Sequence, residues 1–332
     1  MEISIGSKRI GQSHPVYIIA EAADAHLGSM ERAREMVRLA KLAGADAIKF
    51  QHHLPDEEML KDIPLSDNFE EPLYDFLKRS ALTIGQHREL KNYCKEVDIQ
   101  YLCTPFSLKA AEELQTIEIA AYKIGSGEMT DIPTLERIAA FGKPMIISTG
   151  MCTYDEIDRT YEAMQKQGIP LILMYCLSEY PPRYEDCNLG VIKEMCGRYP
   201  RALIGQSDHT PDPYTCFAGI ALGARVFEKH VTVSHLLPGP DRSVSLDFQE
   251  LAILVDGLRK LEKALGDEKR VHDKEKMIRE WAFRSIVAIH DIPKGATITG
   301  NMIWSKRPGT GIPSWRRGEV IGKRAKRDLL RN

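Results

Sequence analysis

Short apolar segments alternate with segments of helical periodicity along most of this chain. The apolar segments have the composition of buried strands and end abruptly at polar residues; they are residues 16–20, 45–50, 99–103, 120–124, 144–148, 171–175, 202–205 and 226–227. The intervening segments repeat apolar residues three and four positions apart and are expected to be helices, at residues 29–43, 84–97, 108–115, 132–141, 153–166, 188–198, 214–223 and 247–265. Eight such alternating units predict an α/β fold, a (β/α)8 TIM barrel.

An open, doubly wound sheet is the alternative architecture for this alternation. That fold normally carries a glycine-rich dinucleotide loop after a strand, and this sequence has none. The barrel is therefore the expected fold. A small hairpin at residues 2–11 precedes it, and a long excursion with helical pieces at residues 52–82 interrupts it.

The pattern changes near residue 266. Residues 267–280 are strongly charged and are expected to form a linker. Beyond it, residues 285–290 and 297–299 are expected to be strands, and the tail at 316–331 is basic. We therefore divide the chain into a barrel domain at 1–266, the linker, and a small second domain at 281–332.

Composition and charge narrow the function classes. The chain has 332 residues and a formal net charge of −2, which gives no sign of nucleic-acid or membrane binding. No apolar run approaches the length of a bilayer span, and the N-terminus lacks the core of a signal peptide. Seven cysteines without a Cys-x-x-Cys pair argue against a disulfide framework and a structural zinc site. These features predict a cytoplasmic protein.

Polar, chemically capable residues stand at the carboxyl ends of the eight expected strands, which is the edge where barrel enzymes carry their active sites. In strand order they are Glu21, Lys49, Thr104, Lys123, Ser148, Ser178, His209 and His230.

Two of these residues form a candidate metal site. The strands that end at His209 and His230 are joined by one helix, so their ends should be adjacent and both side chains should reach one ion. Asp208, Glu228 and Lys229 surround them in sequence. Two ligands leave positions open for water and substrate, as in a catalytic Mn²⁺, Mg²⁺ or Zn²⁺ site that polarises a carbonyl. The alternative is that each histidine is a hydrogen-bonded structural residue.

The lysines predict an anion site. Lys49 and Lys123, with nearby hydroxyls, suit a phosphate or carboxylate, and a Schiff-base lysine is the alternative. Glu21 and Glu128 are candidates for general acid or base, although each could simply balance a lysine. The hydroxyl donors expected at this site are Thr104, Ser126, Ser148 and Ser207.

A series of motifs in order along the chain resembles the sialic acid synthase family. The motifs are Ile19-Ala-Glu21, Lys49-Phe-Gln51, Cys103-Thr-Pro-Phe106, Tyr122-Lys-Ile-Gly-Ser-Gly-Glu128, Ser148-Thr-Gly-Met151, Tyr180-Pro, Gly205-Gln-Ser-Asp-His-Thr210, Glu228-Lys-His230 and Pro238-Gly-Pro-Asp241. Lys306-Arg-Pro-Gly-Thr-Gly311 resembles the antifreeze-like (SAF) domain of the same family. The resemblance implies condensation of phosphoenolpyruvate with an N-acetylmannosamine-type sugar and water, giving a nine-carbon 2-keto acid and phosphate.

The resemblance also implies roles for individual residues. Catalytic roles fall to Glu21, Glu128, His209 and His230, and the two histidines would hold a divalent metal, with Mn²⁺ the first choice and Mg²⁺ or Co²⁺ the alternatives. Arg307 would reach the sugar in the partner's barrel, because family members form domain-swapped homodimers. The substrate-binding residues would be Lys49, Gln51, Thr104, Lys123, Ser126, Ser148, Tyr180, Ser207, Asp241 and Arg307.

This sequence departs from the family pattern at two positions near the sugar and at its end. Ala25 and Ser178 stand where the family commonly has asparagine, and the chain stops soon after Arg327-Asp-Leu, which predicts a shortened second domain. The Ser178 difference favours a substrate other than N-acetylmannosamine. The alternatives are a legionaminic or pseudaminic acid synthase that uses a diacetamido-trideoxyhexose, and a non-catalytic carbohydrate-binding barrel.

Overall fold

The computed structural model describes residues 1–64 and 71–332 and divides into two compact units, Met1–Leu265 and Gly266–Asn332. The part of the excursion at residues 65–70 lies outside the described residues. Among the helices that the structure describes, none combines the length and apolar character needed to cross a bilayer.

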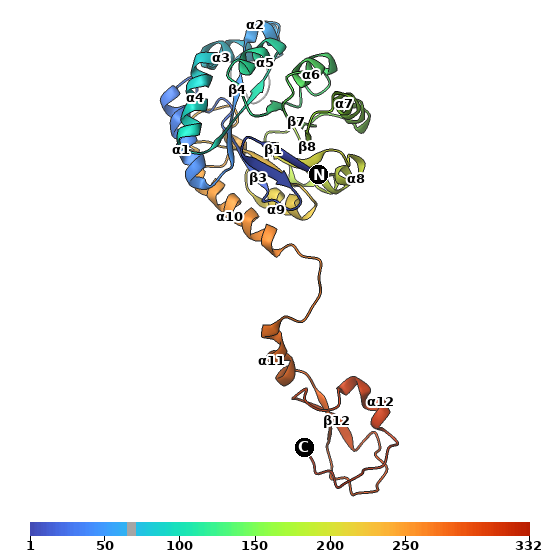
Figure 1. Cartoon of the computed structure of the whole chain (residues 1–332). Coiled ribbons are helices and arrows are strands. Elements are labelled where there is room, and N and C mark those ends of the chain that lie inside the picture. The colour runs from blue at the N-terminus through green and yellow to red at the C-terminus, as the bar shows by residue number, and fades with distance from the viewer. Residues whose placement is uncertain (65–70) are drawn as a thin grey trace. The chain divides into compact units, whose positions relative to one another are not determined.

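Eight parallel strands close into a barrel in the first unit (Figure 1), in the order β10-β3-β4-β5-β6-β7-β8-β9. This closure confirms the predicted (β/α)8 fold and excludes the open sheet. The strands are β3 (Tyr17–Glu21), β4 (Ala47–His52), β5 (Gln100–Pro105), β6 (Tyr122–Ile124), β7 (Met145–Ser148), β8 (Leu171–Cys176), β9 (Leu203–Asp208) and β10 (Val226–His230).

Amphipathic helices follow the strands and pack on the outside of the barrel (Figure 1). Most of them begin at polar caps, and Thr83, Thr153 and Asp247 each form a capping box with the glutamine or glutamate three residues later. The helices that cover the strands are α1 (Met30–Ala43), α4 (Ile84–Glu96), α5 (Leu108–Gln115), α6 (Ile132–Ala139), α7 (Tyr154–Gln167), α8 (Gly190–Arg198), α9 (Tyr214–Ala221) and α10 (Phe248–Ala264).

Successive residues of each strand face opposite sides, one toward the barrel interior and the next toward the helices. On β10, Val226 belongs to the apolar cluster inside the barrel and Phe227 to the cluster beneath the helices. Glu228 and His230 share the inward parity of Val226, whereas Lys229 has the outward parity. The same period of two brings Glu21, Lys49 and further polar side chains to the carboxyl rim.

The remaining elements of the first unit close the barrel or extend its rim. The predicted N-terminal hairpin is confirmed as β1 (Glu2–Ile5) and β2 (Lys8–Gly11), and its isoleucines join the interior cluster. The excursion after β4 contains α2 (Pro55–Glu58) and α3 (Leu73–Ser80), and short 3₁₀ turns lie at η1 (Tyr184–Asp186) and η2 (Arg242–Val244).

The second unit differs from expectation at two places. Residues expected in the linker form α11 (Asp273–Ala282). The strand expected at 297–299 is absent, because Ile298 instead packs into a small core with Ile292, Ile303 and Ala325 while Thr297 makes a single bridge to Arg324. The antiparallel pair is β11 (Ser285–Ala288) with β12 (Ile303–Lys306), followed by η3 (Ser314–Arg316) and α12 (Arg317–Val320).

Candidate active site

A cavity of about 530 Å³ opens at the carboxyl ends of the barrel strands. Its volume suits a small-molecule substrate. Thirteen of the fourteen residues expected to act on or bind substrate line this cavity, and Arg307 is the exception. The thirteen are Glu21, Lys49, Gln51, Thr104, Lys123, Ser126, Glu128, Ser148, Tyr180, Ser207, His209, His230 and Asp241.

The two lysines share a carboxylate that the sequence analysis did not assign to the site. The Oε1 atom of Glu228 lies 3.2 Å from Nζ of Lys123 and 3.5 Å from Nζ of Lys49. Lys49 also pairs with Oε2 of Glu21 at 2.9 Å. Two cations and two carboxylates are therefore buried together, and the expected anion site is electrically balanced rather than strongly cationic.

Hydroxyl groups complete this arrangement. Lys49 donates to Oγ1 of Thr104 at 2.9 Å, and Lys123 donates to Oγ of Ser148 at 2.8 Å. Ser207 donates to Oε1 of Glu228 at 3.2 Å. Each ammonium group thus has a directional partner as well as a charge, which fixes its position at the rim.

Burial and pairing shift the pKa values of this group in different directions. Burial lowers the pKa of Lys123, and Glu228 only partly opposes it. Burial acts the same way on Lys49, but two carboxylates outweigh it and its pKa is raised. Burial raises the pKa of Glu21, whereas for Glu228 the two lysines outweigh burial and the pKa is lowered.

The two histidines expected to hold a metal are neighbours. Their ring centroids lie 5.3 Å apart, and the ring of Tyr180 stacks on His209 at 4.2 Å. Nδ1 of His209 donates to the carbonyl of Leu177 at 2.7 Å, and Nε2 lies 3.1 Å from the Tyr180 hydroxyl; in the neutral ring Nε2 carries the lone pair. Nδ1 of His230 lies 3.5 Å from Oδ2 of Asp241.

These histidines fit a divalent cation in their donor chemistry. Burial lowers the pKa of His230 well below its usual range, so its imidazole is neutral and able to coordinate. The Leu177 carbonyl sets the tautomer of His209 and leaves Nε2 as the coordinating atom. Burial raises the pKa of the adjacent Asp241 to about 7, and a nearby cation would favour its charged form.

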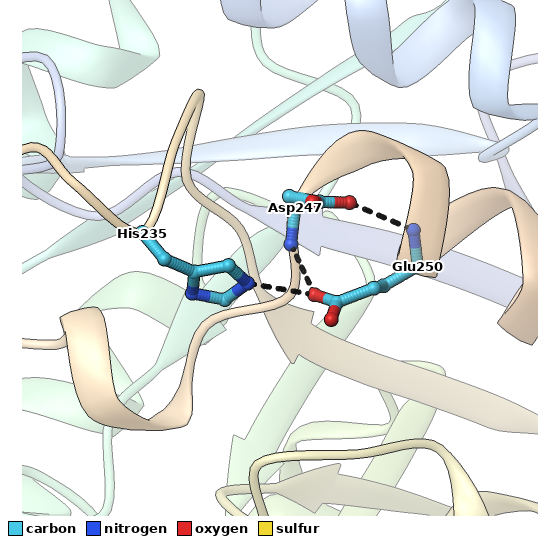
Figure 2. Close-up of side chains that lie close together, drawn as sticks. All are labelled: His235, Asp247 and Glu250. Atoms are coloured by element: carbon cyan, nitrogen blue, oxygen red, sulfur yellow. Dashed lines mark hydrogen bonds and ion pairs between the residues drawn. The ribbon is translucent and has the colours of Figure 1, made fainter.

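A second group of candidate metal ligands joins the loop after β10 to the first turn of α10. His235, Asp247 and Glu250 bring their ligand atoms within 4.8 Å of one another (Figure 2). Asp247 and Glu250 are already engaged as the capping box of α10, and Nε2 of His235 donates to Oε2 of Glu250 at 2.9 Å. The helix cap accounts for this geometry, so we assign no metal to it.

Glu128 presents a carboxylate oxygen that is free for chemistry. Its Oε2 atom is buried and has no hydrogen-bond partner among the described residues, and burial raises its pKa. Gly125 makes this position accessible, because a Cβ atom there would lie 2.4 Å from Oε2 of Glu128. The Gly-Ser-Gly segment therefore makes room for a protein carboxylate at Gly125.

Ser126 and Ser178 meet at another glycine. Gly150 donates its backbone N–H to Oγ of Ser126 at 3.0 Å, and a Cβ at Gly150 would lie 2.1 Å from Oγ of Ser178. Ser178 lines the cavity next to Cys176, whose Sγ lies 3.8 Å away. Gly150 and Ser178 therefore shape the same part of the wall.

Several cavity residues were not predicted from the sequence, and two neighbours of the histidines in sequence lie outside the cavity. Asp24, His53, Glu58, Cys176 and Glu228 line the cavity, and the period of two along β8 and β10 could have placed the last two. By the same parity Asp208 and Lys229 face the helices, where they form a buried ion pair with each other behind the sheet. They therefore do not belong to the metal site.

Arg307 is exposed on the second unit. Its Nε atom donates to the carbonyl of Ala282 at 3.1 Å, and its guanidinium lies 5.4 Å from the ring centroid of Trp281. These contacts hold the arginine against α11 of its own unit, and its expected role at the sugar stays a prediction.

Comparisons with known proteins identify the family of this chain. The chain matches the NeuB family over residues 36–270 and the SAF domain over residues 283–332. It is 34% identical to the N,N'-diacetyllegionaminic acid synthase of Legionella pneumophila over 98% of this chain and 94% of that protein. It is 34% identical to the pseudaminic acid synthase of Campylobacter jejuni over 95% of this chain and 93% of that protein.

A solved structure is also similar. The N-acetylneuraminic acid (sialic acid) synthetase of Leptospira borgpetersenii, crystallised in complex with citrate, superposes with a TM-score of 0.77 at 32% identity. The match covers 84% of this chain and 95% of that one.

Proposed function

The chain belongs to the NeuB family and carries a SAF domain, and we propose that it is a nonulosonic acid synthase. In this proposal it condenses phosphoenolpyruvate with an N-acetylmannosamine-type sugar and water. The products are a nine-carbon 2-keto sugar acid and inorganic phosphate. The observation that carries the proposal is the pair of buried lysines beside a buried histidine pair at one barrel rim.

The lysine group is the proposed site for phosphoenolpyruvate. Lys49 and Lys123 would bind its phosphate and carboxylate, with hydroxyl donors from Thr104, Ser126, Ser148 and Ser207. The shared Glu228 holds both ammonium groups at the rim before the anion arrives. The substrate then replaces part of an existing ion-pair network, so the lysines need little reorganisation.

The histidine pair is the proposed site for the aldehyde of the open-chain sugar. His209 and His230 would hold a divalent ion, Mn²⁺ as first choice, which would polarise the aldehyde oxygen as a Lewis acid. Carbon 3 of phosphoenolpyruvate bonds to the aldehyde carbon, and the aldehyde oxygen takes a proton. Glu21, which pairs with Lys49 and accepts from Gln51, would interact with the charge that develops at carbon 2.

Glu128 is the proposed base for water. Its unpartnered buried oxygen and raised pKa suit a carboxylate that accepts a proton as water adds to carbon 2. The bond between carbon 2 and the phosphate oxygen then breaks, which leaves the keto group and releases phosphate. As the keto group forms, the carbon-2 hydroxyl loses its proton to the departing phosphate. The proton that Glu128 takes from water replaces the one delivered to the aldehyde oxygen, so the step balances.

The sugar end of the site supports a choice among family substrates. Tyr180, Asp241 and Gln51 line this part of the cavity, together with Ser178. A serine offers a shorter side chain than the asparagine expected here and no amide. We therefore favour a diacetamido-trideoxyhexose, the precursor type for legionaminic or pseudaminic acid, over N-acetylmannosamine.

We further propose a homodimer in which Arg307 of one chain completes the sugar site of the other. The planar guanidinium suits an acetamido carbonyl or sugar hydroxyls. Its exposure on the second unit leaves its terminal nitrogens accessible to a ligand.

A non-catalytic sugar-binding barrel is the rival function. It would have no physical need to combine the buried lysine group, the adjacent histidines and the unpartnered carboxylate oxygen of Glu128 at one rim. The test is phosphate release from phosphoenolpyruvate over a panel of acetamido sugars with added Mn²⁺. Release that requires one of the sugars supports the synthase; binding of a sugar with no release under any condition supports the rival. Borohydride trapping of substrate on Lys49 or Lys123 would instead favour the Schiff-base alternative.

A further inference from the structure

A chain of hydrogen bonds runs from helix α2 to the proposed reacting centre. Nε2 of Gln51 donates to Oε1 of Glu21 at 2.8 Å, and the other amide atom, Oε1, lies 3.0 Å from Nε2 of His53. Nδ1 of His53 lies 3.0 and 3.2 Å from the two carboxylate oxygens of Glu58. His53 and Glu58 line the same cavity as Gln51 and Glu21, and no role has been given to either of them above.

The acceptors at the two ends of this chain determine where its protons are. Glu21, paired with Lys49, offers its Oε1 as an acceptor, so the NH₂ group of Gln51 must face it and the amide carbonyl must face His53. That carbonyl needs an N–H from Nε2 of His53, and the carboxylate of Glu58 needs one from Nδ1. Both ring nitrogens therefore carry a proton, and His53 is an imidazolium.

The charges around His53 agree with this assignment. Burial alone would lower its pKa, but Glu58 and Asp24 outweigh burial and raise it, with a smaller contribution from Glu128. Oδ2 of Asp24 lies 3.6 Å from Nε2 of His53, on the side of the ring that also faces Gln51. His26, in the loop after β3, also faces this group, and burial lowers its pKa.

The surroundings of His53 prevent it from turning away. The residue is 5% exposed, and its ring stacks on Phe106 with centroids 4.2 Å apart and planes 19° apart. Glu58 also accepts the backbone N–H of Leu54 at 3.2 Å, which holds the carboxylate in place. A flipped Gln51 amide would put its NH₂ group against a buried N–H of His53, so the amide is held in one orientation.

We infer that His53, clamped by Glu58, is a positioning residue that fixes the Gln51 amide as a hydrogen-bond donor toward Glu21 and the sugar. The amide carbonyl of Gln51 accepts from His53, and one of its N–H groups donates to Glu21. Gln51 then has one donor left for a ligand in the cavity. The sugar atom that meets Gln51 is therefore an acceptor oxygen. This inference rests on the proposed synthase function.

The protonation state of His53 can be tested without turnover. Ring-nitrogen NMR of the full chain at pH 7, with His53 assigned from the signal lost in His53→Phe, should show both nitrogens protonated. His53→Phe keeps a ring to stack on Phe106 while it removes both donors. A neutral imidazole at this position would overturn the clamp, whatever the enzyme catalyses.

The functional part uses kinetics on the same variant. If wild type releases phosphate, His53→Phe should lower kcat/KM for the sugar by tenfold or more and leave the KM for phosphoenolpyruvate within about twofold. His52→Gln is the matched control, because His52 is the buried neighbour that bonds Glu113 instead of Gln51; it should keep the wild-type ratio of the two constants. If His53→Phe raised the KM for phosphoenolpyruvate as much as the KM for the sugar, the role of His53 would be merely structural.

A double-mutant cycle separates positioning from any independent effect. In a Gln51→Ala background, adding His53→Phe should cost less than twofold further in kcat/KM for the sugar, because the residue through which His53 acts is already gone. Additive losses would overturn the inference. If wild type itself shows no sugar-dependent phosphate release, the synthase proposal fails, and the NMR result still decides whether the clamp exists.

Discussion

Oε1 of Glu228 lies 3.2 Å from Nζ of Lys123, and the same oxygen is 3.5 Å from Nζ of Lys49. One buried carboxylate thus holds together the two cations on which the proposed anion site depends. The arrangement explains how two lysines can be buried side by side before substrate binds.

Removing this carboxylate should make the empty protein less stable and more responsive to anions. Glu228→Gln keeps the shape but leaves two buried ammonium groups without their shared partner, which we expect to cost about 3 kcal/mol of unfolding free energy. Added phosphoenolpyruvate should raise the melting temperature of the variant more than that of wild type. Ser207→Ala, which removes one hydrogen bond to Glu228, is the milder control. A variant as stable as wild type would contradict the role given to Glu228.

Buried histidines behind β4 predict a loss of stability in acid. Burial lowers the pKa of His87 well below its usual range and also lowers that of His52, which lies edge-on to it at 4.7 Å. The unfolded chain then binds more protons than the native one below about pH 6.5. The free energy of unfolding therefore decreases as the pH is lowered, by up to about 1.4 kcal/mol per pH unit for each such proton.

His87→Gln should flatten this dependence, because the variant has no proton to bind there and its amide oxygen can still accept from Tyr101, which donates to His87 at 2.8 Å. Urea unfolding between pH 5 and 7.5 measures the slope. His235→Gln, at an exposed histidine, should leave it unchanged. The same slope in His87→Gln and wild type would show that this histidine titrates normally.

The metal proposal predicts which histidines matter. His209→Ala or His230→Ala should abolish turnover and high-affinity Mn²⁺ binding by calorimetry while the fold persists. Chelator-treated wild type should be inactive and recover with Mn²⁺ or Mg²⁺. His235→Ala tests the exposed cluster in Figure 2 and should leave Mn²⁺ binding intact. Full activity of wild type in a strong chelator would contradict a catalytic metal.

Arg307 tests the proposed exchange between subunits. Arg307→Ala should raise the sugar KM far more than the KM for phosphoenolpyruvate, whereas Arg316→Ala, at another exposed arginine beside a tryptophan of the same unit, should raise neither. Mixing Arg307→Ala with His209→Ala chains under exchange conditions should restore some activity, since one barrel then has His209 and receives an intact Arg307. Demonstrated heterodimers without recovery would show that Arg307 acts within its own chain or not at all.

The sequence predicted the barrel well because the strands are buried on both faces and read as apolar runs ending in polar residues. The sequence pattern also predicted that one rim carries Lys49, Lys123, His209 and His230, because parallel strands end at the same edge. What it could not supply was side-chain pairing across strands. The hydrogen-bond series Glu58–His53–Gln51–Glu21 depends on the conformation of the loop after β4. Neither the hydrophobic periodicity nor the residue spacing predicts that conformation.

The second unit was predicted less well for a similar reason. Its core contains few residues, among them Ile292, Ile298, Ile303 and Ala325, so local patterns there are weak. Ile298 looked like the centre of a strand, but its burial against Ile303 is satisfied without one.

The central claim is that carbon 2 of phosphoenolpyruvate loses its phosphate by breaking the carbon–oxygen bond during condensation. The most direct measurement uses phosphoenolpyruvate labelled with ¹⁸O at the oxygen between carbon 2 and phosphorus, incubated with the preferred acetamido sugar and Mn²⁺. The account predicts that mass spectrometry finds the label in the released phosphate and an unlabelled nine-carbon 2-keto acid formed in equal amount. Unlabelled phosphate, with the label in pyruvate and no nine-carbon product, would mean simple hydrolysis at phosphorus and would contradict it.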